Sequence, residues 1–191
     1  LTRIRLQLEL MSDREDAEAI RADLAEMEDM IDAYLSFAAG EGEEPTEDTD
    51  LQTMLDRMVT QTRNAHGFDI AFDMPSPSLP VFPVRRKAIR RAFENIISNA
   101  LAYATQTRIT ARYRNDEVTI TFDDNGAGIP AERRADALRP FVRLETSRNR
   151  QTGGTGLGLS ITSDIVLGHG GDLTLDDSPL GGLRVIIKLP V

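Results

Sequence analysis

Two asparagines one helical turn apart are the first residues whose spacing could do chemistry. Asn95 and Asn99 stand within Arg91–Leu101, where apolar residues recur at helical spacing and the two asparagines occupy a different face. Two amide oxygens placed in this way can meet one Mg²⁺, a hard cation that takes oxygen ligands and phosphates together. Two exposed asparagines would show the same spacing, so the pair alone does not establish a metal site.

Two glycine-containing segments could hold the other parts of a nucleotide. The segment Asp123–Pro130 follows an apolar strand, and a carboxylate there can accept a hydrogen bond from an adenine amino group while glycines let the backbone pass close to a purine. The segment Gly153–Leu159 opens a helix whose backbone N–H groups could receive phosphates, although it lacks the ending of a P-loop. Taken singly, an ordinary turn and a loop explain the two segments equally well.

Four arginines precede the second glycine segment, in a chain that is otherwise acidic. They are Arg139, Arg143, Arg148 and Arg150. Arginines near a phosphate loop can hold triphosphate oxygens, whereas a solvated charged loop is the commoner origin of such a cluster. Residues Leu144–Thr152 are polar and end beside glycines, so we predict a lid that closes when phosphates engage the arginines.

The composition narrows the class of protein. A net charge of -9 over 191 residues argues against nucleic-acid binding. The absence of cysteine excludes a disulfide framework, a cysteine nucleophile and a thiolate zinc site, and two histidines are too few for a histidine-based metal site. No apolar run is long enough to span a bilayer, so we expect a soluble, cytoplasmic segment that a membrane sensor could precede in the parent protein.

The elements that would position these residues begin with a helical hairpin over residues 1–39. Apolar residues such as Leu1, Ile4 and Leu8, and later Ile20 and Leu24, follow the spacing of a coiled-coil seam. Two such hairpins would complete a four-helix bundle, which predicts a homodimer. A hairpin packed on the rest of its own chain would carry the same seam.

Residues 40–49 are rich in glycine and acidic residues, which predicts a solvated linker to a domain over 50–191. That domain mixes helices with antiparallel strands, so we predict a two-layer α+β sandwich. The first helix is expected to open with a capping box at Thr49–Gln52 and to end at His66-Gly67. The other expected elements are strands at 68–74, 107–114, 117–123, 172–175 and 183–189, with a hairpin turn at Asn115-Asp116, and helices at 84–104 and 157–167.

Together, and in this order, the motifs resemble the catalytic domain of sensor histidine kinases of the EnvZ-like type. The asparagine helix resembles the N box, Asp124–Gly128 the Asp-x-Gly-x-Gly box, Arg139–Val142 part of the Phe box, and Gly154–Leu159 the second glycine box. The resemblance implies the Bergerat ATP-binding fold, which Hsp90, gyrase and MutL share. It also implies binding of ATP with Mg²⁺ and transfer of the γ-phosphoryl group to a histidine, and from there to an aspartate of a cognate response regulator.

The resemblance also implies a role for individual residues. Asn99 and Asn95 would bind Mg²⁺, Tyr103 would stack on or edge the adenine, and Asp124 would bind its amino group. The remaining roles are shaping the purine pocket (Gly126, Gly128, Ile129), covering the phosphates (Arg143 and the lid) and supporting them (Gly154, Thr155, Gly156, Leu157, Gly158, Leu159).

Some residues depart from the family pattern. Ala102 stands where many relatives carry Lys or Arg, and Leu138 replaces the first aromatic residue of the Phe box. The stretch Leu1–Leu6 resembles the sequence directly after the phosphoacceptor His box, so we expect the acceptor histidine upstream of Leu1. We expect His66 and His169 to be structural or exposed.

Two other functions fit parts of the same pattern. An ATP hydrolase of the wider fold is expected to carry a water-activating glutamate four residues before the first N-box asparagine, where this chain has Arg91. A non-enzymatic scaffold that binds a nucleotide, dimerises and contacts a response regulator is the second alternative.

Overall fold

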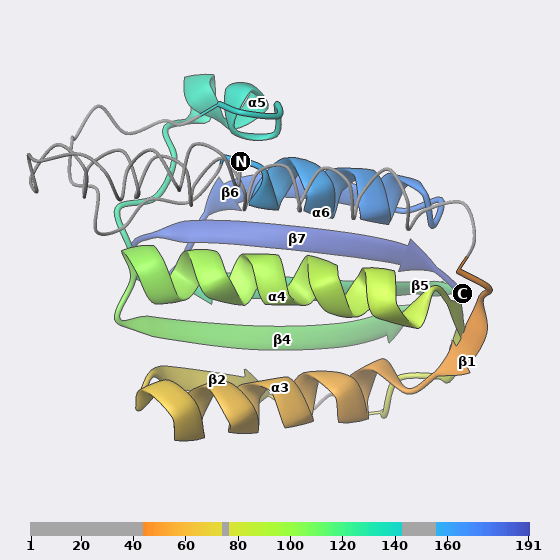
Figure 1. Ribbon diagram of the computed structural model, residues 1–191. Coiled ribbons are helices and arrows are strands. Elements are labelled where there is room, and N and C mark those ends of the chain that lie inside the picture. Colours follow the sequence, from red (N-terminus) through yellow and green to blue (C-terminus); the bar gives the residue numbers. More distant parts are fainter. Residues whose placement is uncertain (1–43, 74–76, 143–155) are drawn as a thin grey trace, which may run out of the picture. The chain divides into compact units, whose positions relative to one another are not determined.

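The computed structural model describes residues 44–73, 77–142 and 156–191, which belong to one structural unit, Glu43–Val191 (Figure 1). The hairpin predicted over 1–39, the homodimer inferred from it and the lid predicted over 144–152 lie outside the described residues. The elements in chain order are β1 (Glu47–Thr49), α3 (Leu51–His66), β2 (Asp69–Asp73), β3 (Phe82–Val84), α4 (Arg86–Tyr103), β4 (Gln106–Arg114), β5 (Glu117–Asp124), the short 3₁₀ helix η1 (Ala131–Arg133), α5 (Arg134–Ala137), α6 (Gly158–Leu167), β6 (Asp172–Asp177) and β7 (Leu183–Pro190).

Five strands form a mixed sheet in the order β2-β4-β5-β7-β6. Strand β2 runs parallel to β4, whereas the other neighbouring pairs are antiparallel. A parallel pair needs a long crossover connection, and α4 lies in the chain between β2 and β4. A second, two-stranded sheet pairs β1 with β3. The mixture of parallel and antiparallel strands with helices confirms the predicted α+β class.

Helices α3, α4 and α6 cover one face of the five-stranded sheet (Figure 1). Residues facing the helices alternate along the strands with residues facing away, as the two-residue period of a strand requires, and Ile109 and Ala111 of β4 are buried on the helix side. Helix α4 packs Phe93 against Phe122 of β5, with the ring centroids 5.7 Å apart. The predicted two-layer sandwich is therefore confirmed. None of the helices in the described part of the chain combines the length and the apolar character that a bilayer crossing requires.

The turn between β4 and β5 confirms the hairpin predicted at Asn115-Asp116. Both residues have positive φ angles, 53° and 57°, which is the backbone of a two-residue turn that matches the twist of the flanking strands. Asparagine and aspartate tolerate this conformation better than most residues. The turn sets the register of the two strands, so Thr107 near the start of β4 lies opposite Asp124 at the end of β5.

Helix α3 begins with a different cap from the predicted one. The carboxylate of Asp50 accepts hydrogen bonds from the backbone N–H of Thr53 at 2.9 Å and from its hydroxyl at 2.6 Å, so Asp50 is the N-cap. The predicted capping box beginning at Thr49 is wrong, because Thr49 is the last residue of β1. The predicted end is confirmed: Gly67 follows the helix with a φ of 61°, a left-handed conformation that glycine adopts readily.

The last residues of the predicted linker over 40–49 are ordered parts of the domain. Glu47–Thr49 forms β1, and the carboxylate of Glu44 caps α4. Its two oxygens accept from the backbone N–H groups of Lys87 at 2.6 Å and Ala88 at 3.1 Å. First-turn amides have no partner within their own helix, and a negative charge is stabilised at that end. Glu44 therefore fixes the start of the domain to the helix that carries the asparagines.

His169 holds the residue that directly precedes α4. Its Nε2 accepts from the backbone N–H of Arg85 at 3.0 Å, so the Nδ1–H must donate to the carbonyl oxygen of Ile165, 2.7 Å away. Only a neutral ring can make both hydrogen bonds, because a protonated imidazole has no acceptor. His66 is exposed at the end of α3. The prediction that both histidines are structural or exposed is confirmed.

We predict that acid weakens the domain through His169. Burial lowers the pKa of His169 below 6.5 and the charge of Arg85 acts in the same direction, whereas the hydrogen bond to Ile165 and the charge of Glu44 raise it. The unfolded chain therefore takes up this proton at a higher pH than the folded chain does. The stabilisation by neutral His169 is complete above pH 6.5 and is lost as the pH falls toward the lowered folded-state pKa.

Urea unfolding at about pH 7.5 and about pH 5.5 measures this effect. The matched variant is His169→Gln, whose amide oxygen can accept from Arg85 without titrating. The wild-type protein should lose more unfolding free energy between the two pH values than the variant does. Equal losses in both proteins would contradict the role of the neutral ring.

Candidate functional site

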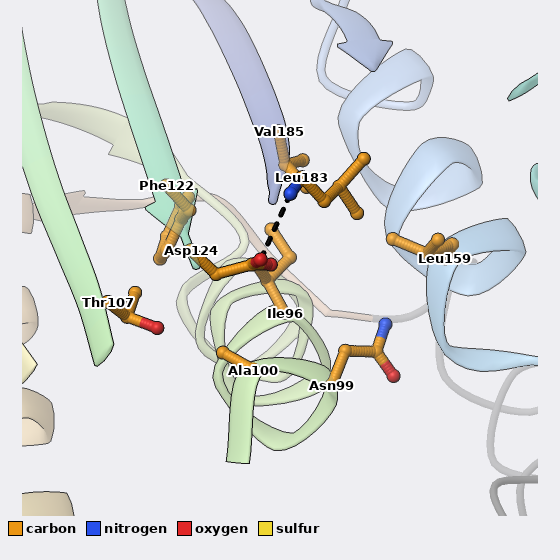
Figure 2. A pocket seen from close by; sticks show the side chains of 9 residues that line it. All are labelled: Ile96, Asn99, Ala100, Thr107, Phe122, Asp124, Leu159, Leu183 and Val185. Atoms are coloured by element: carbon orange, nitrogen blue, oxygen red, sulfur yellow. Dashed lines mark hydrogen bonds between the residues drawn. The ribbon is translucent and has the colours of Figure 1, made fainter. Parts of the chain in front are cut away.

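A narrow pocket lies between the sheet and helices α4 and α6 (Figure 2). It encloses about 10 Å³, room for about one water molecule, so a larger ligand must displace side chains or lie at its mouth. The pocket brings together residues that are far apart in sequence, from two helices and three strands. The lining residues are Ile96, Asn99, Ala100, Thr107, Phe122, Asp124, Leu159, Leu183 and Val185.

Asp124 is held firmly by the backbone on two sides. Its Oδ1 accepts a hydrogen bond from the N–H of Gly126 at 2.8 Å. It accepts another from the N–H of Leu183 at 2.9 Å, which Figure 2 shows. No hydrogen bond from a described residue reaches the other oxygen, Oδ2. The carboxylate is therefore fixed in position by one oxygen, and its second oxygen can accept a hydrogen bond from a ligand.

The neighbouring Asp123 has a separate, structural task. Successive residues of a strand point to opposite faces, so Asp123 faces away from the helices while Asp124 faces the pocket. The Asp123 side chain is 5% exposed and receives two hydrogen bonds from the guanidinium of Arg184, at 2.7 and 3.0 Å. This hydrogen bonding raises the pKa of Arg184. Only Asp124 of the two carboxylates can therefore serve a ligand in the pocket.

Close backbone approach explains the glycines around Asp124. A Cβ on Gly126 would lie 2.6 Å from the carbonyl oxygen of Tyr103, and Gly128 has a φ of 69°. A Cβ on Gly182 would overlap both Asp124 Oδ1 and the backbone nitrogen of Gly126. The sequence motifs include the first two glycines but not Gly182. The signal was available, since Gly181-Gly182 lies directly before the last predicted strand.

The predicted purine-pocket residues Tyr103 and Ile129 do not line the pocket, and neither do Gly126 and Gly128. Tyr103 is 44% exposed at the end of α4, and the contact the structure gives it is through its backbone, against Gly126. Asn125 fixes this region, because its side-chain oxygen accepts from the N–H groups of Thr105 and Gln106, both at 2.9 Å. The carbonyl of Ile129 accepts from Arg134 at 3.1 Å. Stacking of Tyr103 on a base stays a prediction.

The two asparagines converge on the first residue of α6. The Asn95 amide nitrogen donates to the carbonyl oxygen of Gly158 at 3.2 Å. A Cβ on Gly158 would lie 3.8 Å from both polar atoms of the Asn99 amide. Both asparagines are half-buried. Thr162 links α6 to α4 here, because its hydroxyl lies 3.4 Å from the carbonyl oxygen of Ala92 in α4 as well as 2.8 Å from that of Gly158 in its own helix.

The second glycine segment is described only from Gly156 onward. Gly156 has a φ of 68°, and a Cβ there would lie 3.0 Å from the carbonyl oxygen of Val142. Leu157 is buried, and Leu159 lines the pocket. The other predicted phosphate contacts, Arg143, Gly154 and Thr155, lie outside the described residues.

The described residues contain no cluster of three or more His, Cys, Asp or Glu side chains that could hold a metal ion. A cation at this site would therefore need the amide oxygens of Asn95 and Asn99 together with oxygens of the ligand itself. The Asn95 nitrogen already donates to Gly158, which leaves its oxygen for such a contact. Amide oxygens completed by phosphate oxygens suit a hard cation such as Mg²⁺.

We predict that Gly182→Ala disrupts the Asp124 site. The added methyl must push Asp124 or Gly126 aside, and such overpacking costs about 1–3 kcal/mol of unfolding free energy. The backbone amide resonances of Gly126 and Leu183 should shift strongly, because they lose the Asp124 carboxylate.

The matched control is Gly181→Ala, where a methyl meets nothing within 4 Å but the φ of 100° is strained. This control should lose stability while the amide resonances of Gly126 and Leu183 stay close to their wild-type positions. Unshifted amides in Gly182→Ala would show that the close approach at Gly182 does not hold Asp124 in place.

Comparisons with known proteins show which proteins share this arrangement. The sensor protein RstB of Escherichia coli K12 is 32% identical over 209 aligned positions, which cover 100% of this chain and 46% of RstB. The sensor histidine kinase CpxA of the same strain is 40% identical over 126 positions, which cover 65% of this chain and 27% of CpxA. The crystal structure of the ATP-binding domain of PrrB from Mycobacterium tuberculosis has a TM-score of 0.63 and 28% identity, covering 76% of this chain and 96% of that domain. The chain thus spans less than half the length of the two sensor proteins.

A family model described as histidine kinase-, DNA gyrase B-, and HSP90-like ATPase matches residues 84–191, which is more than half of the chain. This segment contains all the pocket-lining residues, from Ile96 to Val185. The chain belongs to this ATPase family and carries the ATP-binding catalytic domain found in sensor histidine kinases.

Proposed function

We propose that the domain binds Mg²⁺-ATP and donates its γ-phosphoryl group to a histidine, as the kinase step of two-component signalling. The observation that carries the proposal is that only one oxygen of the Asp124 carboxylate accepts hydrogen bonds from the described residues. Its Oδ1 is fixed by two backbone amides, and the residue lines a pocket whose other side chains are mainly apolar. A fixed acceptor beside an apolar slot suits a flat base that carries an amino group.

The adenine is proposed to lie at the pocket with its amino group donating to Asp124 Oδ2. The side chains of Ile96, Phe122 and Val185 offer apolar contacts to the ring. Gly126, Gly128 and Ile129 would shape the rim, and Tyr103 would edge or stack on the base. Insertion of the base must widen the pocket, because the enclosed space holds only about one water molecule.

The triphosphate is proposed to extend toward the beginning of α6. Backbone N–H groups at a helix N-terminus attract anions, and Asn95 and Asn99 converge at the same place. Their amide oxygens, with phosphate oxygens, would hold Mg²⁺, which neutralises charge on the phosphates. The other proposed phosphate contacts come from the resemblance: Arg143, Gly154, Thr155, Gly156, Leu157, Gly158 and Leu159.

In the proposed transfer, a histidine nitrogen attacks the γ-phosphorus, the bond to the bridging oxygen breaks, and ADP leaves. The domain contributes positioning and charge neutralisation, since phosphoryl transfer needs little else from the protein. His169 cannot be the acceptor while both its ring nitrogens are hydrogen-bonded within the domain, and His66 ends a helix of the same domain. The acceptor is therefore proposed to lie on another segment or chain.

The wider proposal follows the whole sensor kinases. Residues 1–39 would dimerise as part of a four-helix bundle, the acceptor histidine would lie just upstream of Leu1, and the phosphoryl group would pass on to an aspartate of a cognate response regulator. The parent protein is proposed to be membrane-anchored with this domain in the cytoplasm. Hydrolysis is the weaker alternative, because Arg91 occupies the position where a hydrolase would carry its water-activating glutamate.

We predict that Asp124→Asn weakens ATP binding without unfolding the domain. The asparagine oxygen can still accept from Gly126 and Leu183, but its NH₂ replaces the acceptor that the adenine amino group needs. Loss of a charge-assisted hydrogen bond, about 1.5–3 kcal/mol, corresponds to about ten- to a hundredfold in the Kd of ATP. Calorimetry measures the Kd, and thermal unfolding without nucleotide measures the fold.

The matched control is Asp56→Ala, which removes an exposed carboxylate from α3. Its affinity for ATP should equal that of the wild-type protein. An unchanged Kd in Asp124→Asn, with the wild-type protein binding ATP normally, would contradict the assignment of the base. ITP, whose 6-oxo group accepts a hydrogen bond, should lose less affinity than ATP on this substitution.

We predict that this chain binds ATP but does not phosphorylate itself. Transfer needs the acceptor nitrogen about 3–3.5 Å from the γ-phosphorus, and neither histidine of this sequence can reach that position within the fold. Incubation with γ-labelled ATP should leave no acid-labile, base-stable label on the chain. Label mapped to His66 or His169 would show that the acceptor assignment is wrong.

A further inference from the structure

Thr107 presents a buried hydroxyl whose hydrogen-bonding capacity is unused. The residue is 2% exposed, and its Oγ1 is the one buried side-chain oxygen or nitrogen among the described residues that lacks a hydrogen-bond partner. Buried hydroxyl groups in proteins are nearly always paired, because an unpaired one keeps the full penalty of leaving water. The unused hydroxyl therefore points to a partner that binds from outside the described chain.

The position of Thr107 indicates which partner this is. Thr107 lies directly opposite Asp124 in the β4–β5 pair, and both line the same pocket. Side chains of directly opposed residues lie about 4.5–5.5 Å apart at Cβ, so one small ligand can contact both. Figure 2 shows the Thr107 oxygen turned into the space that the Asp124 carboxylate also borders.

The two groups form a complementary pair for one edge of an amino-purine. A carboxylate accepts hydrogen bonds, and a hydroxyl can rotate to donate one. In adenine the amino group, a donor, is flanked by ring nitrogens, which are acceptors. We propose that the Thr107 hydroxyl donates, directly or through one water, to an adenine ring nitrogen beside the amino group that Asp124 binds. The enclosed space of about 10 Å³ has room for that water.

This inference rests on the proposed function and adds to it a residue that determines which base is held. The motifs singled out in the sequence do not include Thr107, which lies in a strand between the N box and the Asp-x-Gly-x-Gly box. The hydroxyl would favour bases with a ring nitrogen at this edge over bases that carry a C–H there.

The first test is Thr107→Val, which keeps the shape of the side chain and removes the hydroxyl. The Kd of ATP should rise by about two- to tenfold, the range for one neutral hydrogen bond. The nucleotide-free variant should be at least as stable as the wild-type protein in urea, because an unpaired buried hydroxyl has been removed. A purely structural role for Thr107 predicts the opposite pair of results, lower stability and unchanged affinity.

Two further variants act as comparisons. Thr107→Ser restores the hydroxyl and should recover most of the lost affinity. Thr110→Val makes the same chemical change three residues along β4, where the side chain points to the opposite face of the sheet, and should leave the Kd of ATP unchanged.

The second test identifies the atom that Thr107 contacts. The Kd values of 1-deaza-ATP and 7-deaza-ATP, each with one ring nitrogen replaced by C–H, are measured against ATP for the wild-type protein and Thr107→Val. One analogue should bind the wild-type protein more weakly than ATP, while Thr107→Val should bind that analogue and ATP almost equally. If both analogues lose the same factor in both proteins, the hydroxyl does not contact the base.

The two proposals fail in different ways. If the wild-type protein binds no ATP, the proposed function is wrong. If the wild-type protein binds ATP and Thr107→Val binds it with the same Kd, the proposed function stands and the hydroxyl has only an ordinary buried water as its partner, which overturns this inference.

Discussion

The structure around the site depends on the two hydrogen bonds that Asp124 Oδ1 accepts from the backbone. One comes from Gly126, just beyond the end of β5, and the other from Leu183, the first residue of β7. These two hydrogen bonds join the loop that follows β5 to the start of the neighbouring strand β7, beside the pocket. Because one oxygen performs this structural task, the second oxygen is held in a fixed direction without further support. The same carboxylate therefore stabilises the fold and presents a preorganised acceptor.

The other constraint is the attachment of α4, which carries both asparagines. Glu44 caps two of its first-turn amides, and His169 accepts from the N–H of Arg85, the residue directly before the helix. At the other end, Asn125 holds the segment that follows the helix. Helix α4 is thus held at both ends, and α6 is attached to it by the contact of Thr162 with the Ala92 carbonyl and by the hydrogen bond from Asn95 to Gly158. These contacts bring the asparagines, the start of α6 and Asp124 into one region.

Features of local origin could be predicted from the sequence. Three such features are the Asn115-Asp116 turn, the glycine cap at Gly67 and the apolar periodicity of α4. Each depends on residues that are close together in the chain, so a short stretch of sequence is enough to predict it. Strands β1 and β3 were missed because each has three residues and β3 contains a proline, which removes the usual strand signal. Glu44 was read as linker because its partners lie 43 and 44 residues away. Gly182 and Thr107 became meaningful only when strand register placed them against Asp124.

The proposed function requires that Asp124 hold an adenine base in the pocket between the sheet and helices α4 and α6. The most direct measurement is a crystal structure of the protein with Mg²⁺ and a non-hydrolysable ATP analogue. We predict that the amino nitrogen of the base lies within hydrogen-bonding distance of Asp124 Oδ2, with the phosphates extending toward Gly158 and the metal on the amide oxygen of Asn99. A well-ordered nucleotide bound elsewhere, with Asp124 Oδ2 facing solvent, would contradict it.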